Sequence, residues 1–230
     1  MIYTMILIGC RLFQRADEVL SLQYSSLELG LSVMNIEGIV RGIAVTFQGK
    51  TDKVPVTLIL WADDSNPEFC PVRHLLVYIY LLGAKDGFLF PCYDSMIKLL
   101  RGDALVAECV SYDTFLSEFK RGCIQTLSTE RPGAVWGLHS LRKTGYAFGV
   151  WGNAPFTELK AAARHSTDKD AMKYTRDAAT LKAIAEENGT LMSIQWKCPF
   201  VQDRQAALSL NQNIGRLPIT QSSTFLGGHQ

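Results

Sequence analysis

The spacing of apolar positions predicts helices over most of this chain and strands in one place. Residues 2–24 carry apolar side chains at Leu12, Val19 and Leu22 and predict a helix that is broken or bent near Gly9. Residues 42–47 and 54–60 are apolar, β-branched runs on either side of a polar segment, QGKTDK, that has the composition of a turn. These two runs predict a β-hairpin.

Proline, glycine and capping residues indicate where the other helices begin and end. Pro71 suits the first turn of a helix that ends at Gly83. Thr167 with Asp170 forms a capping-box pattern. The remaining helices are expected over residues 111–127, 137–151, 155–164, 169–176 and 178–188. The sequence therefore predicts an α+β fold, mainly α-helical with a small antiparallel sheet, followed after residue 189 by an extension of poor order.

Composition places the chain among ordinary globular proteins but reveals one basic segment. The chain has 230 residues, enough for one substantial core or a domain plus a tail, with 47% apolar residues, 20% charged residues and a net charge of +1. Residues 120–176 contain ten Lys or Arg against four Asp or Glu, a local net charge of +6. Such a segment either solvates a surface or binds a polyanion such as nucleic acid.

The cysteines and the N-terminus indicate an intracellular protein. The six cysteines are scattered, with no CxxC pair and no histidine at metal-ligand spacing. This pattern argues against a zinc site and a disulfide framework and favours a reducing compartment. The apolar start, MIYTMILIGC, has no basic region before it and stops at Arg11, so it is too short for a signal peptide or a membrane span.

Four short patterns could carry chemistry, and each also has an ordinary structural explanation. His139 and Arg142 lie at i and i+3 on one helix face, which is most often a surface pair. The pair Arg164–His165 lies at a helix end, where cations commonly interact with the helix dipole, and Tyr174 could be a packing residue. The first helix carries RADE at residues 15–18, where an intrahelical ion pair is the ordinary account. A fifth pattern, GKT at 49–51, is not a phosphate-binding loop because the glycine required five residues earlier is Ala44.

Taken together and in order, these patterns resemble the catalytic domain of the tyrosine site-specific recombinases, the phage integrase family. The family's first box resembles QRADEVLSL at 14–22, its hairpin lysine resembles the Gly-Lys pair at 49–50, and its HxxR box resembles LHSLRK at 138–143. Its second histidine box resembles ARHS at 163–166, and its nucleophile box resembles KYT at 173–175. The spacings, 23 residues from Arg142 to His165 and nine more to Tyr174, also fit the family.

The resemblance implies a metal-independent and cofactor-independent DNA strand exchange. Tyr174 would be the nucleophile that forms a 3′-phosphotyrosyl intermediate, Arg15 and Arg142 would bind the phosphate, and His139 would accept a proton. His165 would donate a hydrogen bond to the phosphate, Lys50 (with Lys53 as the fallback) would protonate the leaving oxygen, and Glu18 would orient a catalytic cation. Further candidates for DNA contacts are Arg41, Lys53, Lys143, Arg164 and Lys173. The implied partners are double-stranded DNA and further copies of the chain, as a tetramer on paired sites.

Some features depart from the family, and they leave alternatives open. Arg15 lies almost at the start, so the family's N-terminal core-binding domain is expected to be absent or supplied by another chain. We expect a catalytic domain over residues 1–189 and an extension over 190–230 that is partly disordered or docks on a partner. The rival functions are a type IB topoisomerase-like relaxation and a catalytically inactive DNA-binding module. The Trp-containing segment at 145–151 resembles a crypton-like mobile element, which implies the nucleus in a eukaryote and the cytoplasm or nucleoid otherwise.

Overall fold

A computed structural model of the chain describes residues 1–35, 38–48, 54–103, 108–127, 136–190, 194 and 196–200. Its helices are α1 (Ile2–Arg11), α2 (Ala16–Leu20), α3 (Pro71–Leu82), α4 (Tyr93–Leu100), α5 (Tyr112–Leu127), α6 (His139–Trp151), α7 (Phe156–Ala162) and α8 (Asp168–Glu187). Its strands are β1 (Leu27–Asn35), β2 (Gly38–Phe47) and β3 (Val56–Trp61), and two short 3₁₀ turns cover Tyr24–Ser26 and Pro67–Phe69. The predicted class, mainly α-helical with a small antiparallel sheet, is confirmed.

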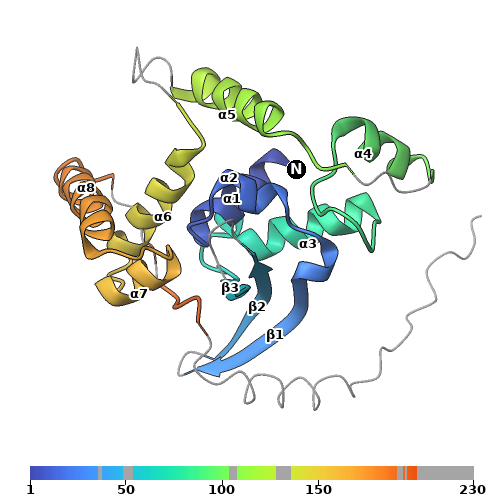
Figure 1. The fold of residues 1–230 in the computed structure, drawn as a ribbon. Helices are drawn as coiled ribbons and strands as arrows, with labels where there is room; N and C mark the ends of the chain where they lie inside the picture. The colour runs from blue at the N-terminus through green and yellow to red at the C-terminus, as the bar shows by residue number, and fades with distance from the viewer. Residues whose placement is uncertain are drawn as a thin grey trace, which may run out of the picture.

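The sheet has the order β1-β2-β3, and both strand pairs are antiparallel. Residues of β2 and β3 that alternate along the strands, among them Val45, Leu58 and Leu60, join the main hydrophobic core. Figure 1 shows the sheet beneath α1 and α3. One face of the sheet is therefore buried against the helices that lead into the candidate site.

Helix α1 runs through the centre of the molecule and brings α2 and α6 together. Two glycines allow α1 and α6 to approach closely. A Cβ added to Gly145 would lie 2.4 Å from the carbonyl oxygen of Cys10, and one added to Gly9 would lie 3.0 Å from the Leu141 side chain. The close crossing places the chain that follows α1 directly beside the helix that carries His139 and Arg142.

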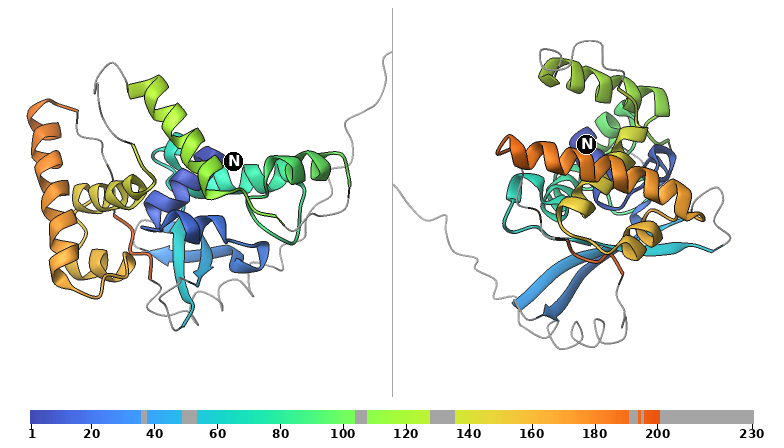
Figure 2. Two further views of the ribbon diagram at one scale, coloured as in Figure 1. Left: turned by 45° about the horizontal axis from the view of Figure 1, so that its top comes forward. Right: turned by 90° about the vertical axis from the view of Figure 1, so that its left-hand side faces the viewer.

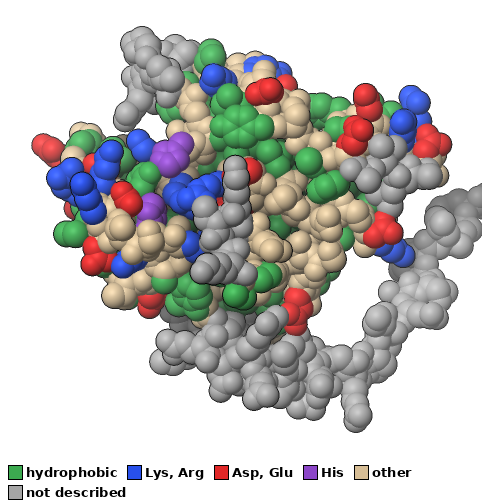
Figure 3. Space-filling view, viewed as in Figure 1, with side chains coloured by type: hydrophobic (Ala, Val, Ile, Leu, Met, Phe, Trp, Pro, Cys, Tyr) green, Lys and Arg blue, Asp and Glu red, His purple; other side chains and the backbone are tan. Residues whose placement is uncertain are grey.

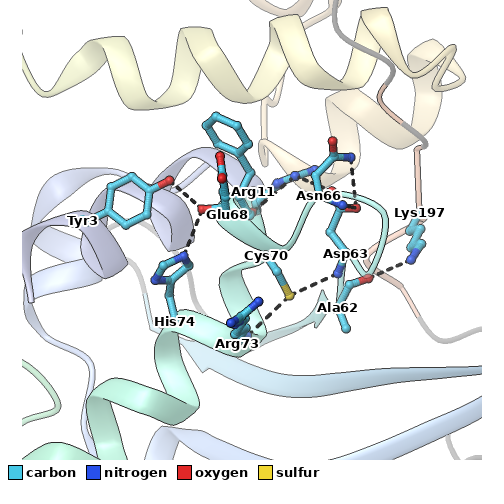
Figure 4. Close-up of polar contacts among 11 residues, drawn as sticks. Tyr3, Arg11, Ala62, Asp63, Asn66, Glu68, Cys70, Arg73, His74 and Lys197 are labelled. Atoms are coloured by element: carbon cyan, nitrogen blue, oxygen red, sulfur yellow. Dashed lines mark hydrogen bonds and ion pairs between the residues drawn. The ribbon is translucent and has the colours of Figure 1, made fainter. Parts of the chain in front are cut away.

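A polar network anchors α1 to the segment between β3 and α3 (Figure 4). Arg11 donates to the Asp63 carboxylate at 2.8 Å, and its guanidinium lies 5.1 Å above the Phe148 ring. Asp63 in turn accepts from the backbone N–H of Asn66 at 3.1 Å, and the hydroxyl of Tyr3 donates to the carbonyl oxygen of Glu68 at 2.8 Å. These contacts hold both ends of α1 in place.

Helices α6, α7 and α8 form the side of the molecule drawn on the left of Figure 1, and α8 contacts α6, which it crosses in the left view of Figure 2. They share a second hydrophobic cluster that includes Phe13, Tyr146, Leu159 and Ala178. The cluster joins the start of the chain to its last long helix.

The short described segment that follows α8 crosses from these helices to the sheet. Trp196 donates its indole N–H to the Glu158 carboxylate at 2.7 Å. The Trp61 indole donates to the carbonyl oxygen of Cys198 at 2.6 Å, and the backbone N–H of Ile59 donates to the carbonyl oxygen of Pro199 at 2.7 Å. This part of the predicted C-terminal extension therefore docks on its own chain.

Several boundaries differ from those expected. The first helix does not bend at Gly9 but ends at Arg11, and the chain turns at Phe13, whose φ is +57°. Strand β1 and helix α4 were not predicted, and the two helices expected over 169–176 and 178–188 are one helix, α8. Helix α3 has the predicted bounds, with Gly83 at φ +68° as its C-cap. No helix among the described residues is long and apolar enough to cross a membrane.

Candidate active site

Tyr174 faces the two histidines that the sequence singled out. It lies on α8, and its hydroxyl is 2.5 Å from Nε2 of His139 on α6. The His165 ring, from the loop between α7 and α8, has its centroid 5.4 Å from that of Tyr174. The expected trio of two imidazoles and one phenol, which spans 35 residues of sequence, is therefore assembled in one place.

Arg142 lies one turn beyond His139 on α6 and is held by the chain that follows α1. Its side chain is buried, with the residue only 4% exposed, and its Nε donates to the carbonyl oxygen of Phe13 at 2.9 Å. Phe13 has left-handed backbone geometry, which is uncommon for a residue with a bulky side chain. This turn aims its carbonyl group at the guanidinium and fixes the direction of Arg142.

Arg15 and Glu18 lie at the start of α2, which borders the site on the side opposite α6. The backbone N–H of Arg15 donates to the Glu18 carboxylate at 2.7 Å, so the glutamate caps the helix that begins there. The Arg15 guanidinium is 3.8 Å from Oε1 of Glu18, and its side chain is 49% exposed. Arg15 is therefore fixed at its backbone while its charged end remains open to solvent.

Arg15, His139 and Arg142 line one open groove of about 200 Å³, together with Tyr112 from the start of α5. Two guanidiniums on one groove provide a site for an anion, because their N–H groups match the oxygens of a phosphate. On the face drawn in Figure 3, histidine side chains lie among Lys and Arg side chains over the region of α6–α8. Among the described residues that line the groove, Arg15 and Arg142 thus outnumber the one carboxylate, that of Asp17.

The pKa values of both histidines are lowered, for the same reasons. Partial burial lowers the pKa of His139, and the positive charge of Arg142 lowers it further. Partial burial and Arg142 also lower the pKa of His165, against a smaller opposite effect of Asp170. Both shifts favour the neutral imidazole, in which a ring nitrogen can accept a proton.

Arg164, predicted as a DNA contact, points inward. Its Nη2 is 2.5 Å from Oε1 of Glu18 and 2.7 Å from Oε1 of Gln14. The two charged side chains are 10% and 2% exposed. The ion pair connects the loop before α8 to helix α2.

The remaining predicted residues fall into two groups. Arg41, Lys143 and Lys173 are exposed, as a DNA contact requires. Lys50 and Lys53 lie outside the described residues, so their predicted roles stay predictions. Within the described part of the chain, no group of three or more His, Cys, Asp or Glu side chains could hold a metal ion.

Three further residues of the site were not predicted from the sequence. Phe13 supplies the carbonyl group for Arg142, and Tyr112 lines the groove. Tyr146 stacks on Tyr174 with ring centroids 5.1 Å apart and an interplanar angle of 19°. Its position four residues after Arg142, on the same helix face, was the one available signal.

Comparison with known proteins finds solved structures that are similar to this chain. No family model matches the sequence, and no curated protein matches it. The post-cleavage complex of the XerH site-specific recombinase bound to palindromic difH substrate is similar, with a TM-score of 0.49 and 19% sequence identity over 81% of this chain and 44% of that chain. The pre-cleavage complex of XerH bound to difH substrate has a TM-score of 0.49 and 17% identity over 75% of this chain and 42% of that chain. The chain thus spans less than half the length of these two structures' chains.

Proposed function

We propose that this chain is the catalytic part of a tyrosine site-specific recombinase, which cleaves and rejoins DNA strands through a covalent bond between Tyr174 and the 3′-phosphate. The observation that carries the proposal is the 2.5 Å contact between the Tyr174 hydroxyl and Nε2 of His139, at the edge of a groove lined by Arg15 and Arg142. A phenol, a neutral imidazole and two guanidiniums form a set suited to phosphoryl transfer without a metal.

The guanidiniums supply the electrostatic part of the reaction. A phosphodiester is an anion that repels a nucleophile, and charge builds up on its non-bridging oxygens in the transition state. Arg15 and Arg142 bind those oxygens and neutralise the charge. Arg142 is already oriented by the Phe13 carbonyl group, so little reorganisation is needed when the DNA binds.

Proton transfers complete the reaction. The Tyr174 oxygen attacks phosphorus, the phenolic proton passes to His139, and the bond from phosphorus to the 5′-oxygen breaks. His165 donates a hydrogen bond to the phosphate, and Lys50 protonates the leaving 5′-oxygen. The phosphotyrosyl bond conserves the energy of the cleaved bond, so a 5′-hydroxyl can later displace Tyr174 and rejoin the strand.

Binding would come from the basic surface, with Arg41, Lys143 and Lys173 contacting backbone phosphates, and affinity would fall steeply with added salt. The same proposal extends to assembly as a tetramer on paired sites, to a mobile-element origin, and to action in the nucleus of a eukaryote or in the cytoplasm or nucleoid otherwise.

A suicide substrate tests the reaction class. The full chain is incubated with a pool of end-labelled duplexes of random sequence, each of which carries a single nick, and the position of the nick varies across the pool. Where the nick lies close to the cleavage position, the short product diffuses away and religation fails. A denaturing gel should show a covalent protein–DNA band for the wild type and none for Tyr174→Phe, which retains the ring and its packing. The absence of a band for the wild type at all salt concentrations, with DNA binding retained, would favour the inactive DNA-binding module.

A second assay separates recombinase from topoisomerase. Relaxation of supercoiled plasmid without paired target sites, abolished by Tyr174→Phe, would favour type IB topoisomerase-like activity. Joining of strands from two different duplexes favours the recombinase.

A further inference from the structure

Tyr146 is a buried aromatic residue that packs against side chains of the candidate site. It lies on α6, and none of its surface is exposed. Its ring stacks on that of Tyr174 at 5.1 Å, meets the edge of the Phe13 ring at 5.4 Å and lies 5.9 Å from the His165 ring. One side chain therefore contacts the proposed nucleophile, one of the two histidines and the residue whose carbonyl group orients Arg142.

The hydroxyl of Tyr146 is buried and has no hydrogen-bond partner among the described residues. Burial raises the pKa of Tyr146 to about 12, so the hydroxyl keeps its proton at neutral pH. Arg142 lowers this pKa and Tyr174 raises it, which puts the hydroxyl within electrostatic reach of both side chains. Among the described residues, the site thus contains a proton donor without a hydrogen-bond acceptor.

Packing alone does not account for a tyrosine at this position. An unpaired hydroxyl in the interior destabilises a fold, and phenylalanine would fill nearly the same volume without that cost. Tyr78 shows the ordinary solution for a buried tyrosine, because its hydroxyl donates to the carbonyl oxygen of Leu89 at 3.0 Å. Tyr146 differs in that the two charged or ionisable groups that act on its hydroxyl, Arg142 and Tyr174, belong to the site itself.

We propose that Tyr146 is a positioning residue for Tyr174: its ring holds the phenol of Tyr174 toward His139, and its hydroxyl donates a hydrogen bond to the Tyr174 oxygen when that oxygen carries negative charge. The inference rests on the proposed function, since it assigns the tyrosine pair to the step in which Tyr174 loses its proton. A hydrogen bond to a charged oxygen is stronger than one to a neutral group, so the donor acts mainly on the ionised nucleophile.

The first test needs no DNA. A fluorotyrosine is incorporated at position 174, and its ionisation is followed by ¹⁹F NMR in otherwise wild-type protein and in the Tyr146→Phe variant. Loss of the donor should lower the ionised fraction of residue 174 about tenfold at a fixed alkaline pH, because the phenolate oxygen loses a hydrogen bond. Tyr78→Phe is the matched control, because it removes a buried hydroxyl elsewhere in the core and should leave this titration unchanged.

The second test measures cleavage of the suicide substrate in single turnover. Tyr146→Phe should slow covalent-complex formation about tenfold at unchanged DNA affinity, and Tyr146→Leu, which also loses the stack, should slow it further. Urea unfolding of each variant separates these effects from stability. An unchanged ¹⁹F titration and an unchanged rate in Tyr146→Phe would overturn the role of the hydroxyl, and a wild-type rate in a folded Tyr146→Leu would overturn the role of the ring.

The two tests also separate this inference from the function on which it rests. A shifted titration in Tyr146→Phe, in a protein that forms no covalent DNA complex, would leave the tyrosine pair standing and reject the recombinase reaction. A covalent complex on Tyr174 with an unchanged titration would do the opposite.

Discussion

The ion pair between Arg164 and Glu18 joins two segments 146 residues apart in sequence, and the structure predicts that it contributes strongly to stability. The pair is nearly inaccessible to solvent, and Arg164 adopts a left-handed backbone with φ +54° to make it. Glu18 also accepts from the backbone N–H of Arg15, so the same carboxylate links stability to the position of a candidate catalytic residue.

The magnitude follows from burial. Removing one partner of a buried ion pair costs about 3–5 kcal/mol, because the other charge stays in a poorly solvated place. We therefore expect Glu18→Gln, which keeps the shape and one carbonyl oxygen, to lose about 3 kcal/mol of unfolding free energy. Arg164→Gly should lose about 2 kcal/mol, because relief of the left-handed backbone returns about 1–2 kcal/mol. The double variant should lose less than the sum by at least about 1 kcal/mol.

Urea unfolding followed by tryptophan fluorescence measures all four proteins of this cycle. The exposed i,i+3 pair Arg121–Glu118 on α5 is the matched control, and its cycle should show no coupling beyond the error of the measurement. If the losses in Glu18→Gln and Arg164→Gly add to within about 0.3 kcal/mol, the two side chains do not act as a pair and the reasoning is refuted.

Four further predictions concern packing, the pH dependence of the rate, the pH dependence of stability, and proton donation. Gly145→Ala should destabilise by about 1–3 kcal/mol, since its new Cβ would collide with a backbone oxygen of α1. Gly122→Ala on α5, whose added Cβ would meet no described atom outside its own helix within 4 Å, should stabilise by about 0.5–1 kcal/mol in the same urea assay. Because the pKa of His139 is lowered, the cleavage rate should stay constant as pH falls to about 6.5 and decrease only below it. A rate that halves near pH 6.5 or above would contradict the role of His139 as proton acceptor. The same conclusion would follow if the decrease at acidic pH were unchanged in His139→Gln. The same shift implies stability that is present above the unfolded-state pKa of about 6.5 and lost as pH falls from there toward the lower folded-state value, which urea titrations at pH 5–7 would measure. Lys50→Ala should cleave slowly on ordinary DNA and at nearly the wild-type rate on a 5′-bridging phosphorothiolate, whose leaving sulfur needs no proton; equal defects on both substrates would exclude Lys50 as the general acid.

Local chemistry was sufficient to predict the elements that depend on local interactions. Helix α3 begins at Pro71 and ends before Gly83 as expected, because a proline at the first position and a glycine after the last need no tertiary contact to act. Thr167 accepts from the backbone N–H of Asp170 at 3.3 Å and begins α8, as the capping pattern predicted. The spacing of His139 and Arg142 likewise put both on one face of α6.

The features that were missed depend on distant parts of the chain. Gly9 was interpreted as a helix breaker, but it lies inside α1 and makes room for Leu141 of α6. The chain turns instead at Phe13, whose strained backbone is stabilised by contacts with Arg142 and Tyr146, residues more than 120 positions away. Strand β1 is an exception, because Leu27, Leu29, Leu31 and Val33 alternate along the sequence in a pattern typical of a strand. Only its bulge, which contains Gly30 at φ +83°, does not follow from that alternation.

Arg164 illustrates the same limit within the site. In sequence it is a basic residue at a helix end, which suggests a DNA contact or a partner for the helix dipole. Its actual partners are Glu18, in α2, and Gln14, just before α2. No periodic sequence pattern connects this segment with the one that carries Arg164. Contacts with residues distant in sequence therefore determine the orientation of the Arg164 side chain.

The central claim is that the oxygen of Tyr174 becomes bonded to DNA. The most direct measurement is to isolate the covalent complex from the suicide substrate, digest the protein and the DNA, and locate the attached nucleotide by tandem mass spectrometry. The account predicts a single modified peptide with the 3′-phosphate on Tyr174, formed without added metal. A nucleotide on another tyrosine, such as the groove residue Tyr112, or a linkage through the 5′-phosphate, would contradict it.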